Sequence, residues 1–207
     1  MALVSLAELK SMVNVDDQLD DQTLTLAINA AISDVELWCG VGGFEQDSTA
    51  TPRRFSASGT CVNFGRSVFA TTTGLIVQTD DNDDGTAETT WTVGTDFELL
   101  PIDGVGPDGR TGWPYTEMRA VGSKAWPRFG VFSSRVYVTA KWGWATAPAP
   151  VKYAALLLAG DHWWAKNAPN GQSGFGDIDP GRILRQNFKV QELLAPYRAG
   201  TSIVGVG

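Results

Sequence analysis

Apolar and polar positions follow a helical period at both ends of the chain and lose it in between. Near the start, Ser5 and Glu8 have the spacing of a capping box, and apolar residues recur behind them, which predicts a short helix over residues 5–13. After an acidic turn, a second run of apolar residues at helical spacing predicts a helix over residues 21–38. Gly40 follows this helix at the position of a C-cap glycine.

The middle of the chain, residues 41–143, is rich in glycine, threonine and aromatic residues and shows no helical period. Residues 73–79 and 86–93 have the composition of strands, and the acidic segment between them, residues 80–85, has that of a turn. Residues 135–142 alternate between apolar and polar side chains, which predicts a strand with one buried face. We expect five or six strands in this section.

Helical spacing returns after Pro148 and Pro150 and predicts a helix over residues 149–166, followed by a final helix over residues 180–195. The sequence thus predicts an α+β fold, a small bundle of about four helices with a β-rich insertion between the second and third. The expected boundaries are residues 1–40 and 144–200 for the bundle, 41–143 for the insertion and 201–207 for a C-terminal tail.

Composition narrows the class of protein. The 207 residues are 43% hydrophobic and 19% charged, which is typical of a globular chain. The longest apolar run, residues 154–160, is far below the roughly 18 residues of a membrane span, and the N-terminus lacks a basic flank and a long apolar stretch. We therefore expect a soluble protein without a signal peptide and without a membrane partner.

The charge balance argues against tight binding to nucleic acid. Sixteen basic and 23 acidic residues give a net charge of −7, whereas proteins that grip DNA neutralise its phosphates with a basic patch. An acidic surface past which DNA slides stays compatible with this charge. The two cysteines and the single histidine are too few for a structural zinc site, so free thiols in a reducing cytosol are expected.

Motifs of catalysis and cofactor binding are missing from the sequence. It contains no glycine-rich phosphate-binding motif, and the segment 171–175 lacks the second glycine of a nucleophile elbow. Nothing in the local sequence places Cys39 or Cys61 beside His162, which we expect to be a packed histidine on an apolar helix face. We expect neither an enzyme nor a cofactor.

A six-residue acidic turn that begins at Asp80 matches the opening of a calcium-binding loop, with Asp80, Asn82 and Asp84 as candidate ligands. Glu88 stands at the ninth position of the loop, but Trp91 occupies the twelfth, where such loops need a bidentate glutamate. An acidic hairpin tip without metal explains the same residues and is the interpretation that we favour.

Eight tryptophans in one chain leave open a platform for stacking sugars. Three of them, Trp38, Trp163 and Trp164, fall on predicted helices, and Trp142 belongs to the alternating strand, so packing accounts for at least half. A carbohydrate-binding β-rich module is kept as the alternative function. An enzyme with an unmarked pair of carboxylates ranks behind it.

The C-terminal region is the best candidate for an interaction surface. Arg182, Arg185 and Lys189 follow a spacing of three and four, which on one helix forms a basic stripe. The stripe fits a solvated face or a contact with an acidic partner or a nucleic acid backbone. Behind it lies the uncharged tail, residues 201–207, in which Ile203 and Val204 have no obvious intramolecular partner.

The order of these motifs resembles a known family. The capped first helix, the acidic turn and the second helix are followed later by the strand Val136 to Trp144, which ends in Trp-Gly-Trp and leads through prolines into the third helix. This set is similar to the head-to-tail adaptor (connector) proteins of tailed double-stranded DNA bacteriophages over residues 1–40 and 134–198. Residues 41–133 are similar only in forming a β-rich insertion.

The resemblance implies a structural virion protein at the head–tail interface, the neck, assembled in the host cytoplasm. It implies a ring, twelve-fold in the family, that docks on the portal protein of the DNA-filled head and presents a platform to the next neck protein, a stopper or tail terminator. Double-stranded DNA passes through its channel without specific binding. The family has no catalytic residues, and the β insertion, with Trp113 and Trp126, would face outward or toward a neighbouring subunit. Carried over to this chain, the docking candidates are Arg182, Arg185, Lys189, Ile203 and Val204.

Overall fold

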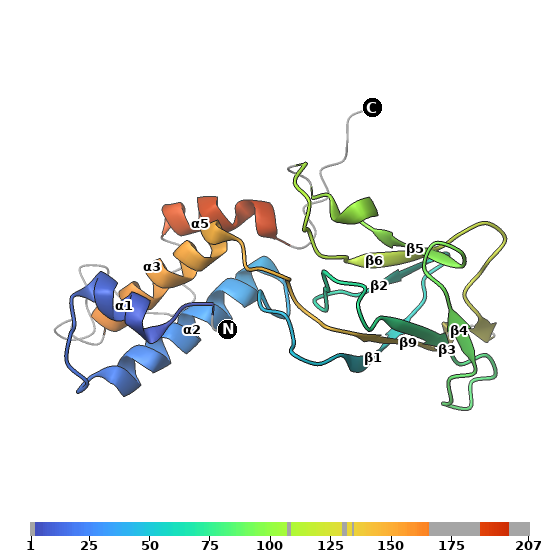
Figure 1. The fold of residues 1–207 in the computed structure, drawn as a ribbon, viewed down its shortest axis with the longest axis horizontal. Helices are drawn as coiled ribbons and strands as arrows, with labels where there is room; N and C mark the ends of the chain where they lie inside the picture. The colour runs from blue at the N-terminus through green and yellow to red at the C-terminus, as the bar shows by residue number, and fades with distance from the viewer. Residues whose placement is uncertain (1–2, 107–108, 130–131, 134, 166–186, 199–207) are drawn as a thin grey trace. The chain divides into compact units, whose positions relative to one another are not determined.

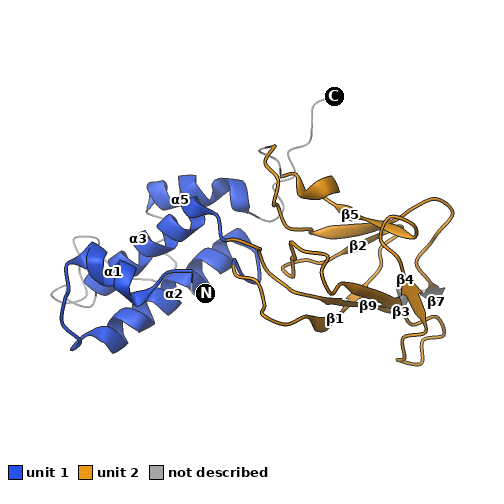
Figure 2. Cartoon of the chain, in the orientation of Figure 1, with its two compact units in different colours: residues 1–44, 147–207 blue, residues 45–146 orange. Residues whose placement is uncertain are grey.

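The computed structural model describes residues 3–106, 109–129, 132–133, 135–165 and 187–198, and the chain folds into two compact units. Residues 1–44 and 147–207 form a helical unit, and residues 45–146 form a β-rich unit (Figure 2). Along the chain, the described strands all follow the second helix and precede the third, as the colours of Figure 1 show. The predicted α+β fold class is confirmed.

The first two helices begin and end at the signals that the sequence carries. Helix α1, Leu6–Val13, has Ser5 as its N-cap, and the capping box closes from both sides. The Glu8 N–H donates to Ser5 Oγ at 3.3 Å, and the Ser5 N–H donates to Glu8 Oε2 at 2.9 Å. Helix α2, Asp21–Cys39, ends at Gly40, whose φ of 70° is the left-handed conformation that glycine adopts without strain.

Helix α3, Ala149–Ala165, matches the predicted third helix, but the last helix differs from its prediction. Helix α5 spans only Phe188–Leu194 and continues into a short 3-10 helix, η3, Ala195–Tyr197. At Asn187 the backbone is non-helical, with φ −88° and ψ 82°, and the side chain accepts a hydrogen bond from the Val190 N–H. A continuous helix over residues 180–195 is therefore wrong, since Asn187 caps a new helix.

The helices of this unit enclose one apolar core. Helix α2 contributes Leu24, Ile28, Ala31 and Val35, and α3 contributes Val151, Ala154, Ala155 and Leu158, all buried. His162, expected to be a packed histidine, lies on α3 with Nε2 2.9 Å from Asp34 Oδ2 on α2. None of the described helices is long and apolar enough to cross a membrane.

The β-rich unit has nine short strands among the described residues, more than the five or six expected. One antiparallel sheet has the order β1–β9–β3–β4, with β1 at Thr51–Ser56, β9 at Arg135–Ala140, β3 at Ile76–Thr79 and β4 at Thr89–Trp91. A second antiparallel sheet has the order β2–β6–β5, at Cys61–Asn63, Glu117–Ala120 and Phe97–Leu100. A third pairs β7, Arg128–Phe129, with β8, Phe132–Ser133, and a 3-10 turn, η1, spans Ile102–Gly104. Strands of two to four residues are too short to show a period in the sequence, which is why they were undercounted.

The inner faces of the two larger sheets share one hydrophobic core. On β9 the alternation is as predicted, with Val136, Val138 and Ala140 buried, and the β3–β4 hairpin is also confirmed. The opposite sheet contributes Phe97 and Met118, both fully buried. Burial of one such side chain is worth about 1.5–3 kcal/mol, so this shared core is what holds the short strands together.

Candidate functional site

The structure places one of the five predicted docking residues. Lys189 lies on α5, is exposed, and has its Nζ 3.6 Å from Glu192 Oε2. Arg182, Arg185, Ile203 and Val204 lie outside the described residues. The basic stripe was predicted on the assumption that all three basic residues share one continuous helix. The non-helical backbone at Asn187 contradicts that assumption.

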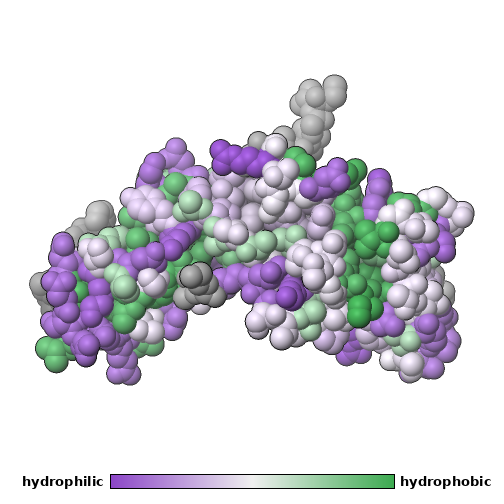
Figure 3. Space-filling model, viewed as in Figure 1, coloured by the Kyte–Doolittle hydropathy of each residue, from purple (hydrophilic) through white to green (hydrophobic). Residues whose placement is uncertain are grey.

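An exposed apolar stripe on α2 is a feature that the sequence analysis missed. Leu26 and Leu37 are 62% and 69% exposed, and with exposed Ala30 they recur at helical spacing on the side opposite the buried residues. The small polar residue Ser33 stands between Ala30 and Leu37 on the same side. Elsewhere in the helical unit, Phe188 on α5 is 80% exposed. Apolar side chains stand among polar ones on the visible face of the molecule (Figure 3). The sequence signal that could have revealed the stripe is a second set of apolar residues at helical spacing, Leu26, Ala30 and Leu37, beside the set that forms the core.

The acidic turn between β3 and β4 is anchored at its base by a chain of side-chain hydrogen bonds. The Trp91 Nε1–H donates to the hydroxyl of buried Thr79 at 2.9 Å, and that hydroxyl donates to Asp81 Oδ1 at 2.7 Å. Thr89 donates to the other oxygen of the same carboxylate. Asp81 is therefore occupied as a structural acceptor at the start of the turn.

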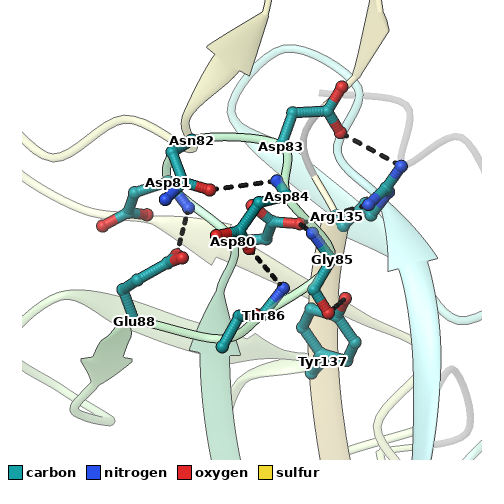
Figure 4. Close-up of polar contacts among 10 residues, drawn as sticks. All are labelled: Asp80, Asp81, Asn82, Asp83, Asp84, Gly85, Thr86, Glu88, Arg135 and Tyr137. Atoms are coloured by element: carbon teal, nitrogen blue, oxygen red, sulfur yellow. Dashed lines mark hydrogen bonds and ion pairs between the residues drawn. The ribbon is translucent and has the colours of Figure 1, made fainter.

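Three other carboxylates gather in the turn. Asp80, Asp84 and Glu88 each offer an oxygen, and these oxygens lie within 4.8 Å of one another. Figure 4 shows the Asp80 and Asp84 carboxylates side by side within the loop. Asn82 was a predicted ligand, but its Oδ1 accepts from the Asp84 N–H at 3.0 Å and so closes the turn. Glu88, flagged only as the ninth position of the motif, is the residue that the structure adds to the group.

Hydrogen bonds and charge fix these carboxylates in place. Asp80 Oδ2 accepts from the Gly85 N–H at 2.8 Å and lies 3.3 Å from Arg135 Nη1. The Thr86 N–H donates to Asp84 Oδ1 at 2.7 Å, and this bond is the main cause of the lowered pKa of the Asp84 carboxyl. The second guanidinium nitrogen of Arg135 lies 3.3 Å from Asp83, which is thus turned away from the group (Figure 4).

Most of the tryptophans are packing residues. Trp126 is buried and stacks on Trp91 with 4.0 Å between ring centroids, and its Nε1–H donates to the Thr60 carbonyl. Since Trp91 covers its ring, Trp126 itself does not face outward or toward a neighbouring subunit, whereas the orientation of the insertion as a whole stays a prediction. Trp113 is half-buried against the edge of Trp144. Of the eight tryptophans, all of which the structure describes, Trp164 alone is exposed, at 55%.

The thiols lack the properties of catalytic nucleophiles. Burial raises the pKa of Cys39, in the helical unit, to about 12. Loss of solvation likewise raises the pKa of Cys61, in the β-rich unit, and a hydrogen bond with Glu117 adds to the shift. A thiolate is the reactive form of cysteine, so these shifts disfavour nucleophilic chemistry at either residue.

Comparison with known proteins locates the fold. No protein-family model matches the sequence, and no curated protein matches it. Among the solved structures with similar chains are three of gene transfer agent (GTA) particles. The neck of an empty GTA particle with C6 symmetry matches with a TM-score of 0.58 and 17% identity, over 98% of this chain and 93% of that one. The virion of the native gene transfer agent (GTA) particle matches with a TM-score of 0.56 and 16% identity, again over 98% and 93%. The neck of the native GTA particle with C12 symmetry matches with a TM-score of 0.54 and 16% identity, over 97% and 91%.

These matches cover the helical unit and the β-rich unit together, since they span nearly the whole of both chains. The chain therefore has the fold of proteins in the neck of gene transfer agent particles. The resemblance noted in the sequence is confirmed at the level of the fold.

Proposed function

We propose that this chain is a structural virion protein that forms a ring at the head–tail interface. The ring joins the portal of the DNA-filled head to the next neck protein, a stopper or tail terminator. The observation that carries the proposal is the fold, which is similar over 97–98% of the chain to chains in two neck structures. The role is one of binding and not of catalysis.

Twelve copies of the chain make up the proposed ring. The expectation comes from the family resemblance, and the symmetries of the two similar neck structures, C6 and C12, are compatible with it. In a cyclic ring each copy contacts the next through two different surfaces. We assign one of these to the exposed stripe of α2 around Leu26 and Leu37, where burial against a neighbouring copy would remove two leucines from water.

The charge of the chain supports a channel that DNA crosses without being held. A net charge of −7 is multiplied in a ring of identical copies, and like charge along the path disfavours adhesion of the phosphate backbone. Docking on the portal is assigned to the C-terminal residues Arg182, Arg185, Lys189, Ile203 and Val204. Repeated weak contacts around a ring add up, so that no single pair of subunits has to bind tightly.

The proposal is tested by immunogold electron microscopy of particles from the source lysate with an antibody against this chain. Gold is expected at the neck, including on particles whose tails have been stripped away. Antibody that has first been absorbed with the purified chain is the control and should label nothing. Particles that lack the chain, or gold spread over the head or tail, would overturn the proposal.

The alternative function, a carbohydrate-binding module, receives no support from the tryptophans. Sugar platforms need exposed aromatic faces, and in the β-rich unit Trp91, Trp126, Trp142 and Trp144 are buried. Only the half-buried Trp113 of this unit could offer part of a ring. Unchanged tryptophan fluorescence during titration with oligosaccharides is therefore expected.

A further inference from the structure

Asp80, at the head of the β3–β4 turn, is an unusual aspartate. It is fully buried, with 0% of its surface exposed, although it carries a carboxylate. Its Oδ2 is held by the Gly85 N–H, which lies across the turn, and by Arg135. Its Oδ1 is also buried, and no hydrogen-bond partner reaches it. A buried carboxylate oxygen without a donor is costly and needs an explanation.

The surroundings of this oxygen point to a cation. Because Oδ2 reaches across the loop to Gly85, the Asp80 carboxylate is directed into the turn, where Asp84 lies beside it (Figure 4). Asp84 and Glu88 are exposed and complete a group of three carboxylates whose oxygens are within 4.8 Å of one another. Two backbone hydrogen bonds hold these exposed carboxylates in position. The Thr86 N–H donates to Asp84 at 2.7 Å, and the Asp81 N–H donates to Glu88 at 2.6 Å. Arg135 pairs with Asp80 only through Oδ2, and three carboxylates this close still repel one another unless a further positive charge lies between them.

We propose that the β3–β4 turn binds one Ca²⁺, with Asp80 Oδ1, Asp84 and Glu88 as its carboxylate ligands. Thr86 stands at the seventh position of the loop motif, from which calcium loops use a backbone carbonyl, and Gly85, with φ 94°, stands at the sixth, where the chain must turn sharply. Solvent reaches the site through the two exposed carboxylates, so water can fill the remaining positions of the ion.

Calcium fits this group better than magnesium or zinc. Its large coordination shell accepts six to eight oxygen ligands in flexible geometry, whereas Mg²⁺ demands a near-ideal octahedron and Zn²⁺ prefers nitrogen and sulfur. The bidentate glutamate of the twelfth position is replaced by Trp91, whose indole is bonded to Thr79 inside the unit. With that ligand missing, we expect weak binding, with a dissociation constant of about 10⁻⁴–10⁻³ M.

The test is a calorimetric titration of the full chain, stripped of metal with EDTA, with CaCl₂ and separately with MgCl₂ at matched ionic strength. One Ca²⁺ per chain is expected, with much weaker heat from Mg²⁺. Asp84→Asn and Glu88→Gln should each abolish the calcium heat. Asp83→Asn is the matched control, because it removes a charge from the same turn at a carboxylate that faces Arg135, and its φ of 64° suits asparagine.

Thermal unfolding gives a second readout that does not depend on the heat of binding. Calcium should raise the unfolding midpoint of the wild type and of Asp83→Asn, and should leave that of Asp84→Asn and Glu88→Gln unchanged. Absence of binding at millimolar calcium would overturn the proposal. Equal binding by the wild type and all three variants would overturn it as well, since it would indicate diffuse attraction to an acidic surface. Binding of magnesium as tight as that of calcium would overturn the choice of ion.

Discussion

Glu8 is the residue in which the local and tertiary contacts of the helical unit meet. One of its oxygens closes the capping box with Ser5 at the start of α1, and the other lies 2.6 Å from Lys152 Nζ on α3. These contacts lower the pKa of Glu8 from 4.5 to about 2. The hydrogen bond from Lys152 contributes most, and the hydrogen bonds from Ser5 come next. The folded state thus favours the ionised carboxylate.

A lowered pKa in the folded state means that the stabilisation is fully present above the ordinary pKa of 4.5 and is lost as the pH falls through about 2. We expect Glu8→Gln to be less stable than the wild type at neutral pH and the difference to shrink steadily below pH 4.5. Urea midpoints measured by tryptophan fluorescence at a series of pH values check this. Lys152→Gln, which removes the largest cause of the shift, should weaken the same dependence on pH. A difference that stayed constant down to pH 2 would contradict the assignment.

Gly143, the middle residue of the Trp-Gly-Trp motif, stands at a position that only glycine can occupy without strain. Its φ is 101°, and a Cβ added there would lie 1.8 Å from the carbonyl oxygen of Glu45, a backbone atom that cannot swing aside. Its N–H also donates to the Val68 carbonyl at 2.6 Å. Replacement by alanine must therefore displace one of two backbone segments.

We expect Gly143→Ala to destabilise the chain by about 2–4 kcal/mol, the sum of left-handed strain and overpacking. Chemical denaturation of the purified variant measures this. Gly94→Ala is the matched control, because Gly94 has a φ of 80° with nothing within 4 Å of the added Cβ, and strain alone should cost about 1 kcal/mol. Equal losses in the two variants would show that the close approach to Glu45 is not what requires glycine.

Among the elements, those with strong local signals were predictable and those fixed by distant contacts were not. The capping box of α1, the C-cap glycine of α2 and the alternation on β9 each lie within a few neighbouring residues, and all three were read correctly. The cap at Asn187 was missed, since asparagine within an apolar helical pattern looks like an ordinary polar position. The burial of Trp126 was missed because it depends on Trp91, which lies far away in the sequence on β4.

The acidic turn shows the same division at the candidate site. The motif placed Asp80 and Asp84 in one turn, and the structure brings them together. The burial of Asp80 and its unpartnered Oδ1 depend on packing and on Arg135 of β9. Neither can be predicted from the residues of the motif.

Helix α2 has a buried side that forms the core and an exposed stripe that we assign to contacts between copies. We expect Leu26→Lys combined with Leu37→Lys to leave the fold intact, since both side chains are already exposed, and to prevent incorporation of the chain into particles. Circular dichroism of the purified variant and quantitative immunoblots of purified particles measure the two effects. Ile102→Lys, at an exposed apolar residue of the β-rich unit, is the control. Normal incorporation of the double variant would remove α2 from the interface.

At the scale of the whole molecule, the chain is a helical unit that carries a β-rich unit between its second and third helices. Both units have buried cores built from the described residues. We expect deletion of residues 201–207 to leave a folded protein that no longer enters particles, because the tail contains the docking candidates Ile203 and Val204. Thermal unfolding and particle immunoblots of the truncated chain check the two halves of this expectation. Normal incorporation would refute docking through the tail.

The central claim, a neck ring built from this chain, is tested most directly by cryo-electron microscopy of the neck in particles from the source lysate. The account predicts a ring next to the portal in which one helical unit and one β-rich unit repeat twelve times, with side-chain density that follows this sequence around Trp126 and Trp142. A ring at that position built from a different chain, in particles whose neck contains no copy of this one, would contradict it.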